Sequence, residues 1–164
     1  MAANAFLSFS DKADGESTQK GKEKWVEIQG WAWDIEAETS WTKGGGASVG
    51  KPSPGAMSWE HTFDTASPVI MSYLCTGKAF PKVELQMSRT TGGAAPETYF
   101  AMVMEGVFIT KVATNAGDDG LVRQQIEMVF KTVKIDYKPQ DARSGKLGAV
   151  KSFSWDIPAG TASP

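Results

Sequence analysis

Cysteine and histidine are almost missing from this sequence. Its 164 residues contain a single cysteine, Cys75, and a single histidine, His61. One cysteine cannot form an intrachain disulfide, which excludes a disulfide-stabilised scaffold and indicates folding in a reducing compartment. A zinc site of usual composition needs three or four His, Cys or carboxylate ligands, so neither residue predicts one. We therefore expect no bound metal and no cofactor.

Long apolar runs and an excess of basic charge are also lacking. No stretch approaches the roughly 18 apolar residues that predict a transmembrane helix, and the first residues lack the features of a cleaved secretory signal. With 17 basic and 19 acidic residues, the net charge is −2, which gives no electrostatic footprint for nucleic acid or anionic lipid. The length suits one domain, so we expect a single domain over residues 1–164 that binds neither nucleic acid nor membrane.

Two loop segments resemble chemical motifs, and each lacks a required part. Residues 45–52 nearly fit a phosphate-binding loop, but Pro52 replaces the hydroxyl residue that would hold magnesium, and no helix is predicted to follow. Asp118 and Asp119 lack the further ligands of a calcium loop and instead favour a turn. Neither segment predicts a ligand site.

His61 could be imagined in a catalytic group with Cys75 or Asp64. However, the sequence contains no nucleophile-elbow pattern. His61 lies between Trp59 and Phe63 on the same face of a predicted strand, which favours a packed or interface side chain. Cys75 is expected to be a buried helix residue. We predict that the protein is not an enzyme.

Alternating apolar residues predict a mainly β protein. One helix is expected, with Ser67 as its N-cap, Pro68 at its first position and Gly77 as its stop. Turn residues 115–120 predict a hairpin between two long strands. The expected strands cover residues 5–9, 24–35, 56–64, 82–89, 98–114, 121–137 and 150–157. They predict an antiparallel β-barrel or two packed sheets of about eight strands with one short α-helix.

Three segments depart from a simple strand pattern. Residues 36–55 are rich in glycine and proline and are expected to form a long loop. The tail, residues 158–164, should be mobile. Residues 98–114 are apolar on both faces, which predicts that a helix or another subunit covers the second face.

The six tryptophans leave room for a second interpretation. Most are expected in the core, but Trp41 lies in the predicted long loop. We expect it to dock against a partner, because aromatic anchors dominate interface energetics. A carbohydrate-binding β-sandwich that uses exposed tryptophans is the alternative function, and a lipocalin-like binder of an apolar ligand is a third.

Four segments in order resemble the haemolysin-coregulated protein (Hcp) family of type VI secretion. Residues 20–34 resemble its second strand with a W-x-W ending, and residues 44–50 its glycine-rich long loop. Residues 63–83 resemble its strand-to-helix segment. Residues 137–140 with 154–157 resemble its closing strands. The resemblance covers about residues 4–157. It departs from the family at Pro52, Pro54 and Ser154.

The resemblance implies a non-enzymatic tube subunit. It implies hexameric rings that stack, a spike protein and a contractile sheath as partners, and small effectors carried in the lumen. It also implies a location in the bacterial cytoplasm before firing, followed by secretion through the type VI system without a signal peptide. Ala32 falls where the family places a small lumen-facing residue. The ring or stacking interface would use a loop with the residues Trp41, Thr42, Lys43, Gly44, Gly45, Gly46 and Val49.

Overall fold

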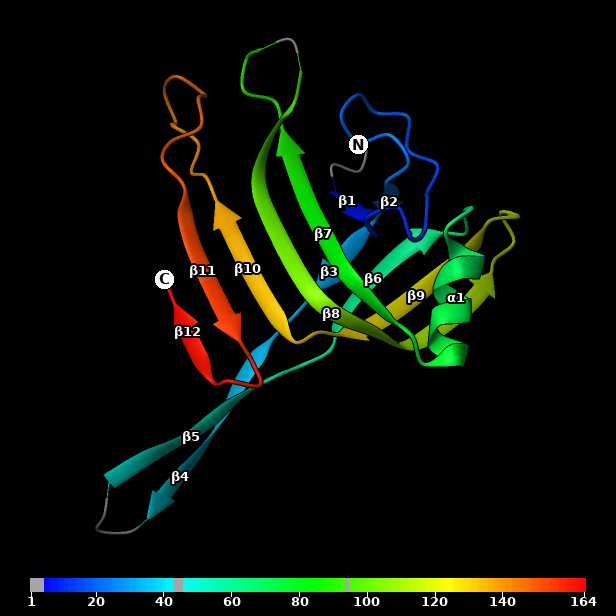
Figure 1. Cartoon of the computed structure of the whole chain (residues 1–164). Coiled ribbons are helices and arrows are strands. Elements are labelled where there is room, and N and C mark those ends of the chain that lie inside the picture. The colour runs from blue at the N-terminus through cyan, green and yellow to red at the C-terminus, as the bar shows by residue number, and fades with distance from the viewer. Residues whose placement is uncertain (1–4, 43–45, 94) are drawn as a thin grey trace.

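The computed structural model of the chain describes residues 5–42, 46–93 and 95–164. Within them, ten strands join into one curved antiparallel sheet, two form a separate hairpin, and there is one helix (Figure 1). This confirms the predicted class, although the sheet is not closed into a barrel. In the described part of the chain, no helix is long and apolar enough to cross a membrane. The ten strands of the sheet are β1 (Ala5–Ser8), β2 (Val26–Ile28), β3 (Gly30–Ala32), β6 (Met57–Thr62), β7 (Ala79–Arg89), β8 (Glu97–Ala116), β9 (Val122–Val129), β10 (Thr132–Tyr137), β11 (Lys151–Asp156) and β12 (Thr161–Ser163).

Strand β8 belongs to both layers of the sheet. Its first half pairs with β10 and its second half with β9, and the change occurs beside Gly106, whose φ is 63°. The predicted single strand 121–137 is therefore two strands. One layer runs β12-β11-β10-β8-β7-β1-β2, and the other continues from β8 through β9 and β6 to β3. The core fills the space between these layers.

The bend at Gly106 also explains why β8 is apolar on both faces. Before it, Met102 and Met104 are buried; after it, Val107 and Ile109 are buried. The buried positions change from even to odd numbers, so the strand turns its opposite face to the core. Much of the two-faced pattern therefore has an intramolecular cause, because the two halves of β8 turn different faces to the core. Phe108 remains 37% exposed.

Helix α1 (Ser67–Thr76) closes one end of the core. The ring of Tyr73 stacks on Phe80 of β7, with centroids 3.9 Å apart. The helix ends at Gly77, as predicted, with a φ of 67°. Its N-cap residue is Ala66, not Ser67, because Ser67 is already in the helix.

Cys75 is exposed, so its predicted burial is wrong. Ile70 is the buried apolar residue of the helix. A residue five positions later lies about 140° further around an α-helix. Cys75 therefore points away from the face that packs on the sheet.

The predicted strand 24–35 is broken at Gln29. Val26 and Ile28 of β2 are buried, whereas Trp31 of β3 and Trp33 are the residues that pack against the core after the break. The amide of Gln29 donates to the carbonyl of Glu60, 2.9 Å away. Gly30 has open space around it, so no other backbone approaches it closely.

The predicted loop 36–55 is a hairpin of strands β4 (Ile35–Thr42) and β5 (Gly46–Pro54). Pro52 lies opposite Ala37 and Pro54 opposite Ile35. Two residues of a strand that are two positions apart direct their amides to the same edge. In a two-stranded ribbon that edge is free, so both prolines are tolerated. The prediction failed because it treated proline as incompatible with any strand.

The predicted mobile tail also contains a strand. β12 pairs with β11 from Asp156 opposite Thr161 to Ser154 opposite Ser163. A tight turn makes this possible: the amide of Gly160, whose φ is 71°, donates to the carbonyl of Asp156. Glycine adopts this conformation without strain.

Candidate functional site

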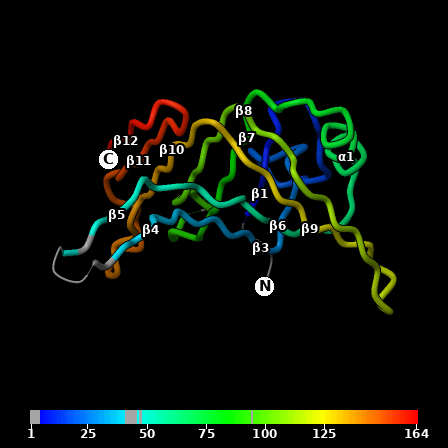
Figure 2. Tube along the Cα trace, turned by 90° about the horizontal axis from the view of Figure 1, so that it is seen from below, coloured from blue at the N-terminus to red at the C-terminus, as the bar shows by residue number. Residues whose placement is uncertain are grey.

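The hairpin of β4 and β5 projects from the body as an arm, which we call the β4–β5 arm (residues 35–54). It extends from one end of the molecule, while α1 and the β8–β9 turn lie at the other end (Figures 1 and 2). Its two strands form a sheet of their own. Every arm residue with a described side chain is exposed except Pro54, which is partly buried. The arm is therefore a protruding surface with almost no core of its own.

The base of the arm is fixed to the body. The amide of Gly55 donates to the carbonyl of Asp34 over 3.0 Å, and Trp33 Nε1 donates to the carbonyl of Gly55 over 3.2 Å. The Trp33 ring in turn packs on Phe130, with centroids 5.4 Å apart. A side chain on residue 55 would meet the carboxylate of Asp34. These contacts set the direction in which the arm leaves the body.

The two outer edges of the arm differ. Proline has no N–H, so Pro52 and Pro54 can pair only at positions whose backbone polar groups point away from the partner strand. Their partners Ala37 and Ile35 therefore also direct their N–H groups outward, along the edge of β4. Prolines thus block the β5 edge, whereas the first part of the β4 edge can accept another strand.

The predicted interface residues fall on this arm. Trp41 lies opposite Ala47 and Thr42 opposite Gly46, close to the tip. Val49 of β5 lies opposite Thr39 and is 72% exposed. The side chains of Trp41 and Thr42, and all of Lys43, Gly44 and Gly45, lie outside the described residues. The structure therefore places Trp41, Thr42, Gly46 and Val49 on the same element, and it does not describe how Trp41 contacts anything.

Ala32 lies away from the arm, on the body. It is exposed on β3 and lies opposite Ser58 of β6. Ser58 pairs in turn with Glu127 of β9, and Glu127 pairs with Lys111 of β8. This row runs across the outer face of one layer. Its side chains are small or polar, so this row is hydrophilic.

Exposed apolar side chains on the body were not identified from the sequence. Phe108 of β8 lies directly opposite Val129 of β9, and these side chains are 37% and 39% exposed. A second group lies at the α1 end and consists of Phe63, Met71, Leu121 and Val122. Met71 lies on α1 and the other residues lie on strands or directly beside them, and only the tertiary structure reveals which of their faces is uncovered.

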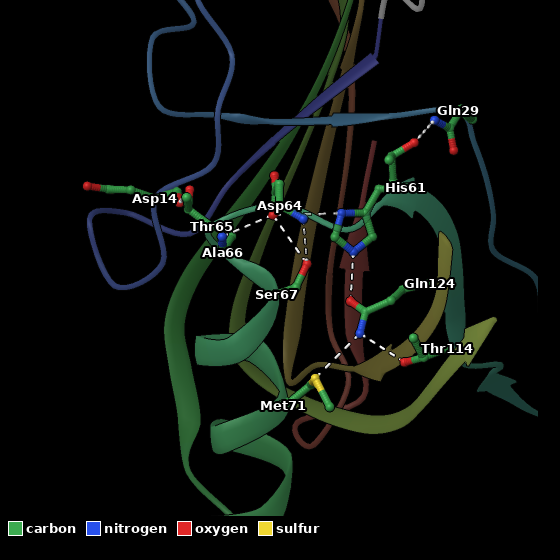
Figure 3. A network of polar contacts seen from close by, with 11 residues as sticks. Asp14, Gln29, His61, Asp64, Thr65, Ala66, Ser67, Met71, Thr114 and Gln124 are labelled. Atoms are coloured by element: carbon green, nitrogen blue, oxygen red, sulfur yellow. Dashed lines mark hydrogen bonds and ion pairs between the residues drawn. The ribbon is translucent and has the colours of Figure 1, made fainter. Parts of the chain in front are cut away.

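A buried polar network connects β6, β9, β8 and α1 (Figure 3). His61 is completely buried, which confirms the predicted packed histidine. Its Nε2 lies 3.1 Å from Oε1 of Gln124. The Nε2 of Gln124 donates to Thr114 Oγ1 over 3.0 Å and to Met71 Sδ over 3.5 Å. The network thus joins three strands to the helix.

Asp64 extends this network to the start of α1. Its Oδ1 accepts hydrogen bonds from the amide of Ala66 over 3.0 Å and from Ser67 Oγ over 3.3 Å. The same Oδ1 lies 3.9 Å from Nδ1 of His61. Burial lowers the pKa of His61, against the opposing effect of Asp64. Burial also raises the pKa of the Asp64 carboxyl, against the opposing effect of His61.

The geometry offers little support for the alternative functions. Of the five tryptophans whose side chains are described, Trp59 and Trp155 are buried and Trp25, Trp31 and Trp33 are partly buried. A carbohydrate platform needs exposed aromatic faces, and none of these five supplies one. Asp119 pairs with Arg123 in the β8–β9 turn, as the predicted turn allows. No group of three His, Cys, Asp or Glu side chains gathers among the residues described here.

Known proteins are similar to this chain in both sequence and fold. The family model described as "Type VI secretion system effector, Hcp" matches residues 6–137. The chain is 27% identical to Protein hcp1 of Pseudomonas aeruginosa over 158 residues, which cover 96% of each chain. It superposes with a TM-score of 0.87 on a structure described as a type six secretion system protein, at 26% identity over 99% of this chain and 100% of the other. Hcp1 from Salmonella typhimurium gives a TM-score of 0.79 at 27% identity, with coverage of 99% and 100%. The chain therefore belongs to the Hcp family of type VI secretion system proteins.

Proposed function

We propose that the chain is a structural tube subunit of a type VI secretion system. Six copies would close into a ring, and rings would stack into a tube. A closed ring uses head-to-tail contacts, in which each subunit presents two different surfaces. The β4–β5 arm, which projects at one end (Figure 2), and the exposed apolar group at the α1 end meet this requirement.

The arm is the observation that carries this proposal. A single two-stranded hairpin is at best marginally stable in water. Here its residues are solvent-exposed, and only its base is fastened, through Trp33, Asp34 and Gly55. A neighbouring copy that covers the arm would supply the missing packing. Membership of the Hcp family supports the choice of a second copy as the partner.

The edge of β4 supplies a specific mode of contact. Ile35 and Ala37 direct their N–H groups outward, whereas Pro52 and Pro54 have no N–H on the other edge. A strand of the neighbouring subunit would therefore add to β4 and not to β5. Main-chain hydrogen bonds would fix the register between subunits.

The remaining parts of the proposal concern the lumen and the secretion apparatus. The hydrophilic row of Ala32, Ser58, Glu127 and Lys111 would line the lumen and contact small effectors through polar groups. The assembled tube would engage a spike protein and a contractile sheath. The chain would wait in the bacterial cytoplasm and leave through the type VI system without a signal peptide. One relative is named "Major exported protein", which supports export.

Light scattering after size exclusion, together with negative-stain images, tests the assembly. We expect a mass of six chains and ring-shaped particles. A folded protein that stays monomeric at all concentrations, with no rings, would contradict the proposal.

Two matched proline substitutions test the edge. Ala37→Pro removes an outward N–H from β4, and we expect it to abolish rings while the circular dichroism spectrum stays unchanged. Pro52→Ala, directly opposite in the same hairpin, is the control and should assemble normally. Equal assembly of both variants would exclude strand addition along β4.

A further inference from the structure

The His61 side chain has one ring nitrogen without a partner. His61 is the only histidine of the chain and is completely buried on β6. Within the described part of the protein, its Nδ1 has no hydrogen-bond partner. A buried polar atom without a hydrogen bond lowers the stability of the fold by about 1–3 kcal/mol, so the unpaired Nδ1 needs a structural explanation. The cause lies in the groups on the two sides of the ring.

Gln124 determines which nitrogen of His61 carries the proton. The Nε2 of Gln124 faces the sulfur of Met71 at 3.5 Å, and a thioether sulfur can only accept. The amide nitrogen of Gln124 must therefore point to Met71 and Thr114, which leaves Oε1 facing His61. An oxygen acceptor 3.1 Å from Nε2 requires an N–H on Nε2. The neutral imidazole is thus the Nε2–H tautomer, and Nδ1 presents a lone pair.

That lone pair faces a carboxylate. Oδ1 of Asp64 lies 3.9 Å from Nδ1, so two acceptors point toward each other. Figure 3 shows Asp64 between the imidazole on one side and the first residues of α1 on the other. One additional proton would turn this opposition into a hydrogen bond between Nδ1 and Oδ1. The same oxygen already accepts from Ala66 and Ser67, so that bond would compete with the fastening of α1.

We propose that His61 and Asp64 form one shared proton site that makes the docking of the first turn of α1 sensitive to pH. Without the proton, Asp64 holds the helix start and His61 Nδ1 is unpaired. With the proton, Nδ1–H donates to Oδ1 and the carboxylate is drawn from Ala66 and Ser67. The device goes beyond assembly of the tube, because it uses only groups within one chain.

Few other charged groups lie near His61 and Asp64 that could stabilise or repel the added proton. The elements packed on the imidazole contribute uncharged groups, namely Gln124 from β9, Thr114 from β8 and Met71 from α1. Asp64 is the charged group that faces the ring, and Glu16 acts on Asp64 from the loop before β2. Burial lowers the pKa of His61 and raises that of Asp64. The interaction between the two groups opposes both shifts, so the pKa of each group depends on the protonation of the other.

Nitrogen-15 NMR of the histidine tests the proposal, because a single histidine gives one unambiguous set of signals. We expect the Nε2–H tautomer at pH 7.5 and protonation of Nδ1 below the ordinary pKa of about 6.5. Asp64→Asn should reduce the proton affinity of His61 about tenfold, since the paired charge is lost. Asp119→Asn, at an exposed turn where the carboxylate pairs with Arg123, is the control and should leave it unchanged.

Amide hydrogen exchange in the wild-type protein tests the link to α1. After correction for intrinsic rates, protection of the Ala66 amide, which donates to Asp64 Oδ1, should fall as His61 takes up its proton. This readout needs no variant to fold. Any one of three results would overturn the proposal. These are an Nδ1–H tautomer at neutral pH, a histidine that stays neutral until the protein unfolds, and hydrogen-exchange protection of α1 that does not change as His61 titrates.

Discussion

Gly106 of β8 lies directly against the side chain of Lys131, at the point where β8 leaves β10 and joins β9. A Cβ added to Gly106 would lie 2.9 Å from Cδ of Lys131. The amide of Lys131 also donates to the carbonyl of Glu105 over 3.0 Å. This contact fixes the bend that lets one strand serve both layers, so the fold depends on a residue without a side chain.

Gly106→Ala should lower the free energy of unfolding by about 1–2 kcal/mol, the cost of holding a non-glycine residue in the left-handed region. The φ of Gly106 is 63°. Urea denaturation followed by tryptophan fluorescence measures the change. Gly30→Ala is the control, because Gly30 has open space and no positive φ. Equal losses in the two variants would show that the bend does not require glycine.

Gly15→Ala should be more damaging than Gly106→Ala. An added Cβ would lie 2.7 Å from the carbonyl carbon of Trp25 and 2.8 Å from Cα of Val26, both backbone atoms that cannot move aside alone. The amide of Gly15 also donates to the carbonyl of Lys24 over 2.7 Å. We expect a loss above about 2 kcal/mol, in the range of overpacked sites. Thermal unfolding of the two variants side by side would reveal the order, and a milder effect at Gly15 would contradict it.

Local patterns in the sequence were sufficient to predict the helix and most of the strands. Ser67, Pro68 and Gly77 marked α1 to within a residue, because caps and stops act over a single turn. The hairpin of residues 35–54 was missed, because proline is acceptable only where a strand edge is free. Whether an edge is free depends on the neighbours in space, and the sequence alone does not contain this information.

The candidate site was predictable only in part. The resemblance to Hcp proteins predicted an interface of Trp41, Thr42, Lys43, Gly44, Gly45, Gly46 and Val49. Of these, the described residues 41, 42, 46 and 49 lie on the arm. The sequence predicted a second apolar face for residues 98–114, which include Phe108. It did not predict the exposed pair of Phe108 with Val129, because the change of face at Gly106 arises from pairing with two different strands. The contact between His61 and Asp64 was considered only as a catalytic pair. Its role at the helix start required the positions of Gln124 and Met71.

Substitutions of two phenylalanines should distinguish an effect on folding from an effect on assembly. Phe80 is fully buried and stacked on Tyr73, so Phe80→Ala should cost about 3–5 kcal/mol of stability. Phe108→Ala removes a side chain that is 37% exposed, and the stability of the single chain should change by less than about 1 kcal/mol. If a neighbouring copy covers Phe108, the second variant should nevertheless form fewer hexamers. Denaturation and light scattering of both variants check this, and normal assembly of Phe108→Ala would remove this pair from the interface.

Acid should destabilise the protein as the pH falls below about 6.5, the ordinary pKa of histidine. Burial lowers the pKa of folded His61, so the unfolded chain binds a proton that the folded chain refuses. The stability contributed by neutral His61 is therefore present above about pH 6.5 and lost as the pH falls toward the folded pKa, by at most about 1.4 kcal/mol per pH unit. Asp64 acts oppositely, because its raised pKa favours the folded state at low pH and this contribution is lost as the pH rises through the folded pKa.

Asp64→Asn should steepen the loss of stability. Asp64 is the charge that opposes the lowering of the His61 pKa. Without Asp64, the pKa of the buried imidazole falls further, and the folded protein takes up this proton only at a lower pH. Because the chain has one histidine, urea denaturation at pH 7.5, 6.5 and 5.5 reports on this residue. We expect the difference between wild type and Asp64→Asn to grow between pH 6.5 and 5.5. A constant difference across the three values would mean that Asp64 contributes only its hydrogen bonds to Ala66 and Ser67, and that it does not share a proton with His61.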